Sequence, residues 1–465
     1  EIQRQSLSDL QIWEILLRVI YAEMLGHNTQ FAHCYVVNSL QNSNYKVKRM
    51  AYNAAGLLLE KDSPFRILMI SSVQKDLENS CLYNKIIALN CLVSLISGFN
   101  SSAFLVQIVK HLVNSQPVVR KKAFLCLIQL EEIAPGTVTN FREELTKGLR
   151  DPDLSVIMAV TPYFSKLAKD SPDDCKSLVP LFLSVLEKIL QRKFPADYEY
   201  ENQPAPWLCI TLVKILSSTT RHDRELSATV LTAFQSTLSG FFALTTDVEV
   251  SVLFQIIMSV LQMPLNADLL TLCTEKITMI SRSGCLRVPE RLFVTLRLVK
   301  QLFSVDGSRS EEFQSLLLDS LDSSDESLRF LAMETMLATV APSGVDVLMQ
   351  RLAPFLQLES ERSRKSIIVQ SFAKVIELRA PSPTWFVQRT LQLFRQSDTL
   401  VDSELLNGFI DSIREIVEFE GAEIFAQINE VLSEYSNKEN LCESTAKLLG
   451  WYLGEFGHLF GEAGD

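Results

Sequence analysis

The chain has 465 residues, 47% of them hydrophobic, and a formal net charge of −11. It can therefore bury a large core, and its acidic balance argues against nucleic-acid binding, which needs a dominant basic surface. The longest apolar stretches, such as "VLFQIIMSVLQMPL" from Val252, are too short to span a membrane. The 16 Gly and 16 Pro do not gather into a long linker, which favours one continuous body over residues 1–465. The chain opens without a Met or a signal peptide, so we expect a fragment of a longer cytoplasmic protein.

The first third of the chain contains a repeat of about thirty-six residues. Four segments of twelve residues align without gaps when each ends on an alanine: Ala51, Ala88, Ala123 and Ala159, at intervals of 37, 35 and 36 residues. A fifth copy, "LDSSDESLRFLA", ends at Ala332. The segments begin with Leu, or with Gly148 in the fourth copy, and continue into a polar turn rich in Asn, Asp and Ser.

The third copy shows what one unit does physically. Before its turn, "FLVQIVKHLV" places apolar residues on one stripe of a helix, and the turn then ends that helix and caps the next. After the turn, Ala123, Phe124 and Leu127 form the facing stripe, and the small alanine allows close helix packing. One hairpin cannot bury both of its faces, but stacked hairpins can. The turn followed by a basic residue is typical of HEAT and armadillo repeats, so we predict an all-α solenoid.

A basic residue recurs three positions before the anchoring alanine: Lys48, Lys85, Arg120 and Arg329, with Val156 in the fourth copy. The first interpretation is that each one caps a helix or pairs with an Asp of the adjacent turn. The second is a basic stripe that faces anionic phospholipid headgroups. That stripe would contain Lys46, Lys48, Arg49, Lys85, Arg120, Lys121 and Lys122.

No catalytic or metal-binding pattern is present in the sequence. The five histidines have no partner at metal-ligand spacing, and no nucleotide-binding, hydrolase or metalloprotease motif occurs. The nine cysteines are scattered singly among mostly apolar neighbours, so we expect small buried side chains. We therefore predict a protein that is not an enzyme and has no cofactor.

The segment "NQPAPWLCITLVKIL" interrupts the helical pattern at Pro204 and Pro206. Proline cannot continue a helix, so residues 194–206 are predicted to be a softer joint within the array. Trp207 is expected to lock the restarting helix against its neighbour. The alternative is that the acidic, tyrosine-bearing "DYEYEN" tip contacts a partner.

Six blocks in order carry a resemblance to the large adaptins. These are "LLRVIYAEMLGHNTQF", "SNYKVKRMAYNAAGLLL", "VQKDLENS", "VVRKKAFLCLIQLEEIAPGTV", "PADYEYENQPAPWLCITLVKIL" and "GWYLGEFG". The "PAPWL" block is similar to alpha and epsilon adaptins, "RVIYAEMLGH" leans towards epsilon, and "LGEFG" leans towards alpha. We favour epsilon, of the fourth adaptor complex, with alpha or gamma next. Ile12, Trp13 and Glu14 stand where alpha adaptins carry phosphoinositide-binding lysines.

The resemblance implies the trunk of a heterotetrameric clathrin-type adaptor complex. Such a trunk would hold small (sigma), medium (mu) and beta-type subunits at trans-Golgi or endosomal membranes. It would be recruited by a GTP-bound Arf-family protein through Phe31, Cys34 and Val37, with a membrane-facing flank of Lys46, Lys48, Arg49 and Lys85. The competing interpretation of Val37 is a core position. The competing function is a HEAT scaffold of another complex, of the phosphatase-regulatory or nuclear-transport type.

Overall fold

The computed structural model describes residues 7–60, 63–97, 101–241, 246–282, 288–321, 323, 325–339, 362–380, 382–397, 403–420, 430 and 443–456. The chain divides into two compact units. Unit 1 comprises residues 1–240 and 251–265, and unit 2 comprises residues 241–250 and 266–465. The expectation of one continuous array over residues 1–465 stays a prediction.

Unit 1 is built from helices joined by short turns. Its elements are α1 (Asp9–Met24), η1 (Gln30–Ala32), α2 (His33–Ser39), α3 (Tyr45–Leu58), α4 (Phe65–Glu78), α5 (Leu82–Leu95), α6 (Ser101–His111), α7 (Pro117–Ile133), α8 (Phe141–Leu149), α9 (Leu154–Asp170), η2 (Pro172–Leu178), α10 (Val179–Leu190), η3 (Ala196–Tyr198), β1 (Glu199–Tyr200), β2 (Gln203–Pro204), α11 (Pro206–Thr220) and α12 (Arg224–Ser239). Helix α13 (Asp247–Val260) begins in the part assigned to unit 2 and ends in unit 1. The predicted all-α solenoid is confirmed, with one short hairpin as its β-structure in the described residues.

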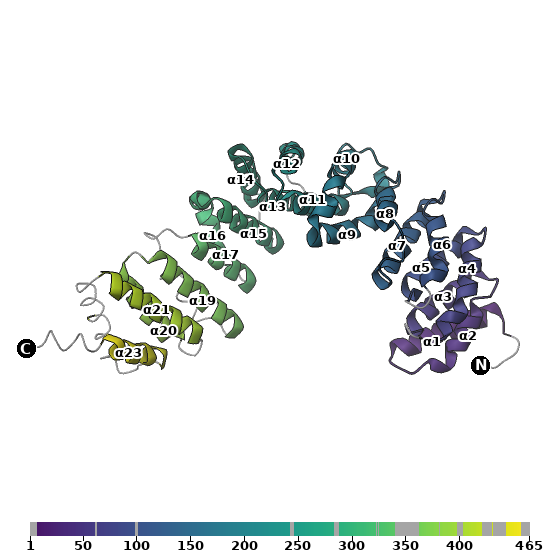
Figure 1. The fold of residues 1–465 in the computed structure, drawn as a ribbon, viewed down its shortest axis with the longest axis horizontal. Helices are drawn as coiled ribbons and strands as arrows, with labels where there is room; N and C mark the ends of the chain where they lie inside the picture. Colours follow the sequence, from purple (N-terminus) through teal and green to yellow (C-terminus); the bar gives the residue numbers. More distant parts are fainter. Residues whose placement is uncertain are drawn as a thin grey trace, which may run out of the picture. The chain divides into compact units, whose positions relative to one another are not determined.

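The helices of unit 1 form two layers, which Figure 1 shows most clearly for the first seven. Helices α1, α3, α5, α7, α9 and α11 pack side by side in one layer, here called the odd layer. Helices α2, α4 and α6 pack against one another in the second, here called the even layer. Each helix thus buries one stripe against the other helix of its hairpin. Its flanks are buried against the helices of neighbouring hairpins, as a solenoid requires.

The repeat anchors lie in the core, with one correction. Ala51, Ala88, Ala123 and Ala332 are each 0% exposed. In the fourth copy the equivalent residue is Val160, at 0%, and not Ala159, at 7%. Helix α9 has its N-cap seven residues before Val160, the same offset that α3, α5 and α7 have from their alanines. The gapless alignment was therefore wrong by one residue there, because a valine and not an alanine fills the anchor position.

The polar turns that precede these helices share one hydrogen bond. A side-chain oxygen of Asn42, Asn79, Asn114 or Asp151 accepts from the backbone N–H two residues later, at 2.7, 2.8, 2.9 and 2.8 Å. This is the Asx turn, which ends one helix and sets the direction of the next. The sequence pattern of the turns is explained by this contact.

Unit 2 continues the helical pattern. Its described elements are α14 (Ala267–Arg282), α15 (Pro289–Val305), η5 (Gly307–Phe313), α16 (Gln314–Leu321), α17 (Glu326–Thr339), α19 (Arg362–Arg379), α20 (Pro383–Ser397), α21 (Ser403–Glu420) and α23 (Glu443–Phe456). Helix α17 carries the fifth anchor, and it packs against both α15 and α16. The repeat therefore recurs in unit 2 with the same packing role.

Candidate partner-binding surfaces

Two of the recurring basic residues form ion pairs with the following repeat. Lys48 Nζ lies 2.6 Å from Asp76 Oδ1, and Tyr52 Oη donates to Asp76 Oδ2 at 2.7 Å. Arg120 makes a two-point contact with Asp151, at 2.7 and 2.8 Å. The predicted pairing with an Asp of the adjacent turn is confirmed for Arg120, whereas Asp76, the partner of Lys48, lies in the last turn of α4. Lys48 is consequently removed from the candidate membrane flank, since its side chain is only 12% exposed and its ammonium group is held by Asp76.

Val37 is a core residue, which corrects its assignment to a contact surface. Its side chain is buried at 6% exposure, beside buried Val36 in α2. A side chain that other helices already cover cannot lie at the centre of an interface with a partner.

Phe31, in η1 where it packs against α2 of the even layer, and Cys34, in α2 itself, are exposed, Phe31 at 71%. The same layer exposes three further apolar side chains: Ile67 at 63%, Leu68 at 61% and Val106 at 73%. We call Phe31, Ile67, Leu68 and Val106 the even-layer apolar band. The sequence analysis missed the last three, although Ile67 and Leu68 lie off the buried stripe of α4, which was the available signal.

The candidate basic residues lie on the odd layer. Lys46 and Arg49 are exposed on α3, and Lys85 is half-buried on α5. Beside them the exposed rings of Tyr45 and Tyr83 lie 5.5 Å apart, a second feature that the sequence analysis missed. Helices α2 and α3 pack together through their buried stripes, so their exposed stripes face away from each other. The predicted apolar centre and basic flank thus lie on different layers, and contact of one partner with both stays a prediction.

Residues 194–206 form a braced hairpin inside unit 1. Strands β1 and β2 pair antiparallel, and the Ala205 N–H donates to the Tyr198 carbonyl at 2.9 Å. Arg192 donates to the Glu199 carboxylate at 2.9 Å and to the Asn202 carbonyl at 2.7 Å. Pro204 is half-buried and Pro206 is buried at the start of α11. The two prolines thus end the hairpin and begin the next helix.

Tyr198 anchors this hairpin to the start of α9. Its hydroxyl donates to Asp153 Oδ1 at 3.0 Å, and Asp153 also caps α9 by accepting from the Ser155 N–H at 2.9 Å. Burial alone would raise the pKa of Asp153, but the hydrogen bonds from Ser155 and Tyr198 outweigh it and lower that pKa. The carboxylate is therefore held in its charged form.

Trp207 does not lock the restarting helix against a neighbour, as the sequence analysis expected. Its side chain is 57% exposed, and its ring lies 5.0 Å from the ring of Tyr200, which is 48% exposed. The reason is its register: Trp207 is the second residue of α11, on the side opposite the buried Leu208, Cys209 and Leu212. The hairpin and the helix start together present two half-exposed aromatic rings.

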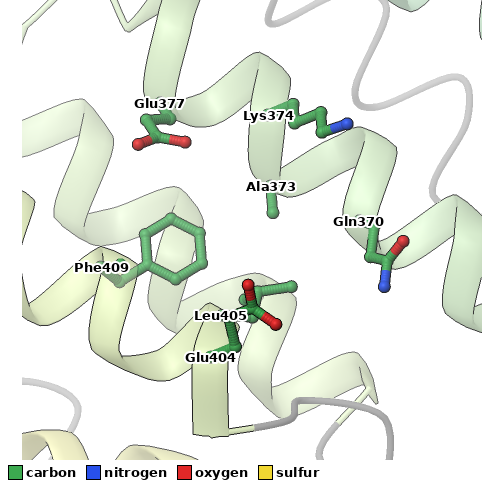
Figure 2. Close-up of a pocket in the computed structure, with 8 residues that line it drawn as sticks. Gln370, Ala373, Lys374, Glu377, Glu404, Leu405 and Phe409 are labelled. Carbon is green, nitrogen blue, oxygen red and sulfur yellow. The ribbon is translucent and has the colours of Figure 1, made fainter.

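The described residues of each unit also line an open cavity. One of about 590 Å³ in unit 1 is lined by the α1–α2 loop and the start of α4, with His27, His33 and Glu60 among its residues. The other, of about 370 Å³, lies between α19 and α21 of unit 2. Figure 2 shows Phe409 and Ala373 facing it, with Glu377 and Glu404 at its rim. Within the described ranges, no group of three or more His, Cys, Asp or Glu is placed to hold a metal ion.

None of the helices in the part of the chain that the structure describes combines the length and apolar content that crossing a bilayer requires.

Comparison with protein families gives a match over nearly the whole chain. The family described as "Adaptin N terminal region" matches residues 3–463. The chain is 26% identical to the AP-4 complex subunit epsilon of Arabidopsis thaliana over 449 residues, which are 96% of this chain and 47% of that protein. It is 24% identical to the human AP-4 complex subunit epsilon-1 over 450 residues, 96% of this chain and 39% of that protein. The AP-2 complex subunit alpha-2 of Arabidopsis thaliana is also 24% identical, over 96% of this chain and 44% of that protein. The chain thus spans less than half the length of these relatives.

Comparison with known structures supports the fold. A homology model of the full-length AP-3 complex matches with a TM-score of 0.61 and 20% identity, covering 97% of this chain and 80% of that chain. Yeast importin-beta matches with a TM-score of 0.55 and 14% identity, covering 97% of this chain and 57% of that chain. The helical solenoid is therefore shared by proteins with different roles.

Proposed function

This chain belongs to the adaptin N-terminal region family, and on that ground we propose that it is the trunk subunit of a heterotetrameric adaptor complex in vesicle-mediated protein transport. Relatives named as epsilon and alpha subunits of adaptor complexes favour a large subunit, with epsilon first. In this role the solenoid scaffolds a small, a medium and a beta-type subunit. The complex then sorts cargo on the cytoplasmic side of trans-Golgi or endosomal membranes.

The family match over residues 3–463 is the observation that carries this proposal. Likeness of fold alone would leave a nuclear-transport scaffold equally possible, since importin-beta shares it. The surface of the chain agrees with a scaffolding role, because large apolar side chains such as Leu17, Ile67 and Val113 are exposed along the early repeats. Partner subunits would cover such side chains.

Co-expression tests the scaffold role. The chain is produced alone and together with small and beta-type adaptor subunits, and each sample is measured by size-exclusion chromatography with light scattering. We expect the lone chain to self-associate and the co-expressed chains to elute as a defined complex. A lone chain that is monodisperse and binds neither subunit would contradict the proposal.

For membrane recruitment we propose contact with a GTP-bound Arf-family protein through the exposed residues of the first repeats. The even-layer apolar band offers Phe31, with Cys34 beside it, as the apolar part of the contact. Lys46 and Arg49, and in part Lys85, supply the basic residues for an anionic membrane, on the other layer.

Liposome sedimentation tests this recruitment. Phe31→Asp should abolish sedimentation of the chain with Arf-GTP liposomes, and Lys46→Glu should make it more sensitive to salt. Val305→Asp, at an exposed apolar site of unit 2, is the matched control and should sediment normally. Normal sedimentation of the Phe31 variant would rule out this surface.

A further inference from the structure

We propose that the hairpin surface formed by Asp197, Tyr200, Glu201 and Trp207 binds an arginine-bearing segment of a partner protein. This site goes beyond the scaffold role and beyond the recruitment surface of the first repeats. It lies in unit 1, where β1 and β2 meet the start of α11.

The aromatic pair is the first reason. Tyr200 and Trp207 are 48% and 57% exposed, and their rings lie 5.0 Å apart at a tilt of 54°. Tyrosine and tryptophan that stay accessible on a rigid support are the residues that most often dominate interfaces. Their ring faces also attract a guanidinium group, which stacks on them more readily than an ammonium group does.

The negative charge of the hairpin that carries Tyr200 is the second reason. Glu201 follows Tyr200 directly at the tip of the hairpin, and Asp197 lies in η3 just before β1. Both carboxylates are exposed, and neither has an ion pair among the described residues, whereas Arg192 neutralises Glu199. Arg192 is a basic side chain that contacts the hairpin, and its guanidinium group is held by Glu199 and by the Asn202 carbonyl, whereas Lys193 lies in the turn after α10. A cation that stacks on the rings would therefore find unpaired carboxylates on the same hairpin.

The backbone conformation of the hairpin is also held by contacts within the chain, without a partner. Arg192, Glu201, Asn202 and Ala205 all have positive φ, at 53°, 47°, 64° and 40°. Such conformations cost energy in non-glycine residues and persist only where surrounding contacts impose them. The Arg192 contacts and the Tyr198–Asp153 hydrogen bond supply those contacts here. A rigid surface loses little conformational entropy on binding, which favours affinity.

Charge complementarity selects the occupant. An anionic membrane or an acidic peptide would be repelled by Asp197 and Glu201. A proline-rich segment would use the rings but gain nothing from the carboxylates. An arginine-bearing segment uses both features, so we assign the surface to that chemistry.

The test is fluorescence anisotropy with four labelled decapeptides, alternating Arg-Gly, Lys-Gly, Glu-Gly and Pro-Gly, and the full 465-residue chain. We expect the arginine peptide to bind best and the lysine peptide several-fold more weakly. Trp207→Ala should weaken arginine-peptide binding about tenfold, which corresponds to 1.4 kcal/mol. Trp207→Phe should retain most of the arginine-peptide binding. Glu201→Gln should weaken that binding and reduce its salt dependence.

The chain supplies a matched control in the Tyr45–Tyr83 pair, which is also exposed but lies among basic residues. Tyr83→Ala should leave arginine-peptide binding unchanged. Circular dichroism confirms folding of each variant, and all the substituted side chains are exposed. Equal binding of the lysine and arginine peptides, preference for the proline peptide, no binding at all, or an unaffected Trp207→Ala variant would each overturn the proposal.

Discussion

Arg120 and Asp151 join two successive repeats through a two-point ion pair. Arg120 Nε lies 2.7 Å from Asp151 Oδ2, and Arg120 Nη2 lies 2.8 Å from Asp151 Oδ1. The remaining nitrogen, Nη1, donates to the Asn114 and Ser115 carbonyls at 2.8 and 3.1 Å. One side chain therefore closes its own turn and holds the next, which explains a basic residue at this position of the repeat.

Removing Arg120 should destabilise unit 1 measurably. The two side chains are only 12% and 7% exposed, so Arg120→Met should lower the free energy of unfolding by about 2 kcal/mol, as expected for hydrogen bonds to a charged group. Urea denaturation provides the measurement. The control is Arg142→Met, which breaks an Arg–Asp pair with 51% and 40% exposed side chains and should cost under about 1 kcal/mol. Equal losses in the two variants would mean that burial adds nothing to the Arg120 pair.

Ala123 should tolerate no larger side chain. It is 0% exposed at the contact between stacked helices, so Ala123→Leu should overpack that contact at a cost of about 1–3 kcal/mol. Thermal melting measures the loss. Ala228→Leu makes the same change on the exposed side of α12 and should leave the melting temperature nearly unchanged. An unchanged midpoint for Ala123→Leu would refute the anchor assignment.

Substitution by aspartate should change the stability of the chain at Val37 but not at Phe31. Val37→Asp places an unpaired charge in the core and should destabilise unit 1 by about 3 kcal/mol or more. Phe31→Asp alters a side chain that is 71% exposed and should leave the far-ultraviolet circular dichroism and the melting temperature unchanged. If Val37→Asp melted normally, the burial assigned to α2 would be wrong.

The sequence alone could predict the fold because each repeat carries the residue types that form its turn and its buried stripe. The buried alanines, the Asx turns and the basic residues Lys48 and Arg120 stand at fixed offsets within the repeat, although the two aspartates that pair with Lys48 and Arg120 do not. The candidate surfaces could be predicted only in part. Which face of a short helix such as α2 is covered depends on tertiary packing, so Val37 was misassigned. The exposure of Trp207 follows from its register at the start of α11, and that start is set by a hairpin whose left-handed residues are not glycines and so gave no signal.

The hairpin anchor should weaken in acid. The folded-state pKa of Asp153 lies below its ordinary value of 3.8. As the pH falls, the unfolded chain therefore binds more protons at this residue than the folded chain does. The stabilisation is fully present above that ordinary value and is lost as the pH drops through the lower folded value. Unfolding free energies measured from pH 6 to pH 3 should therefore fall less steeply for Asp153→Asn than for the wild type. Parallel curves would show that Asp153 is not held in its charged form.

Thiol reactivity should separate the described cysteines into two groups. Cys34 and Cys81 are exposed, whereas Cys91, Cys126, Cys175, Cys209 and Cys273 are buried. Burial raises the pKa of Cys91 to about 12 and that of Cys175 to about 11, so their thiolate is scarce at neutral pH. Maleimide labelling of the native chain at pH 7.5, followed by peptide mapping, should modify Cys34 and Cys81 first. Early labelling of Cys126 would contradict the packing between α5 and α7.

The composition of the complex tests the adaptor-trunk assignment most directly. The chain is tagged in cells that express it, purified by affinity in mild detergent, and the copurifying chains are quantified by mass spectrometry. We expect one small, one medium and one beta-type adaptor subunit for each copy of this chain. Recovery of nuclear-transport or phosphatase subunits in stoichiometric amount, without adaptor subunits, would contradict the assignment.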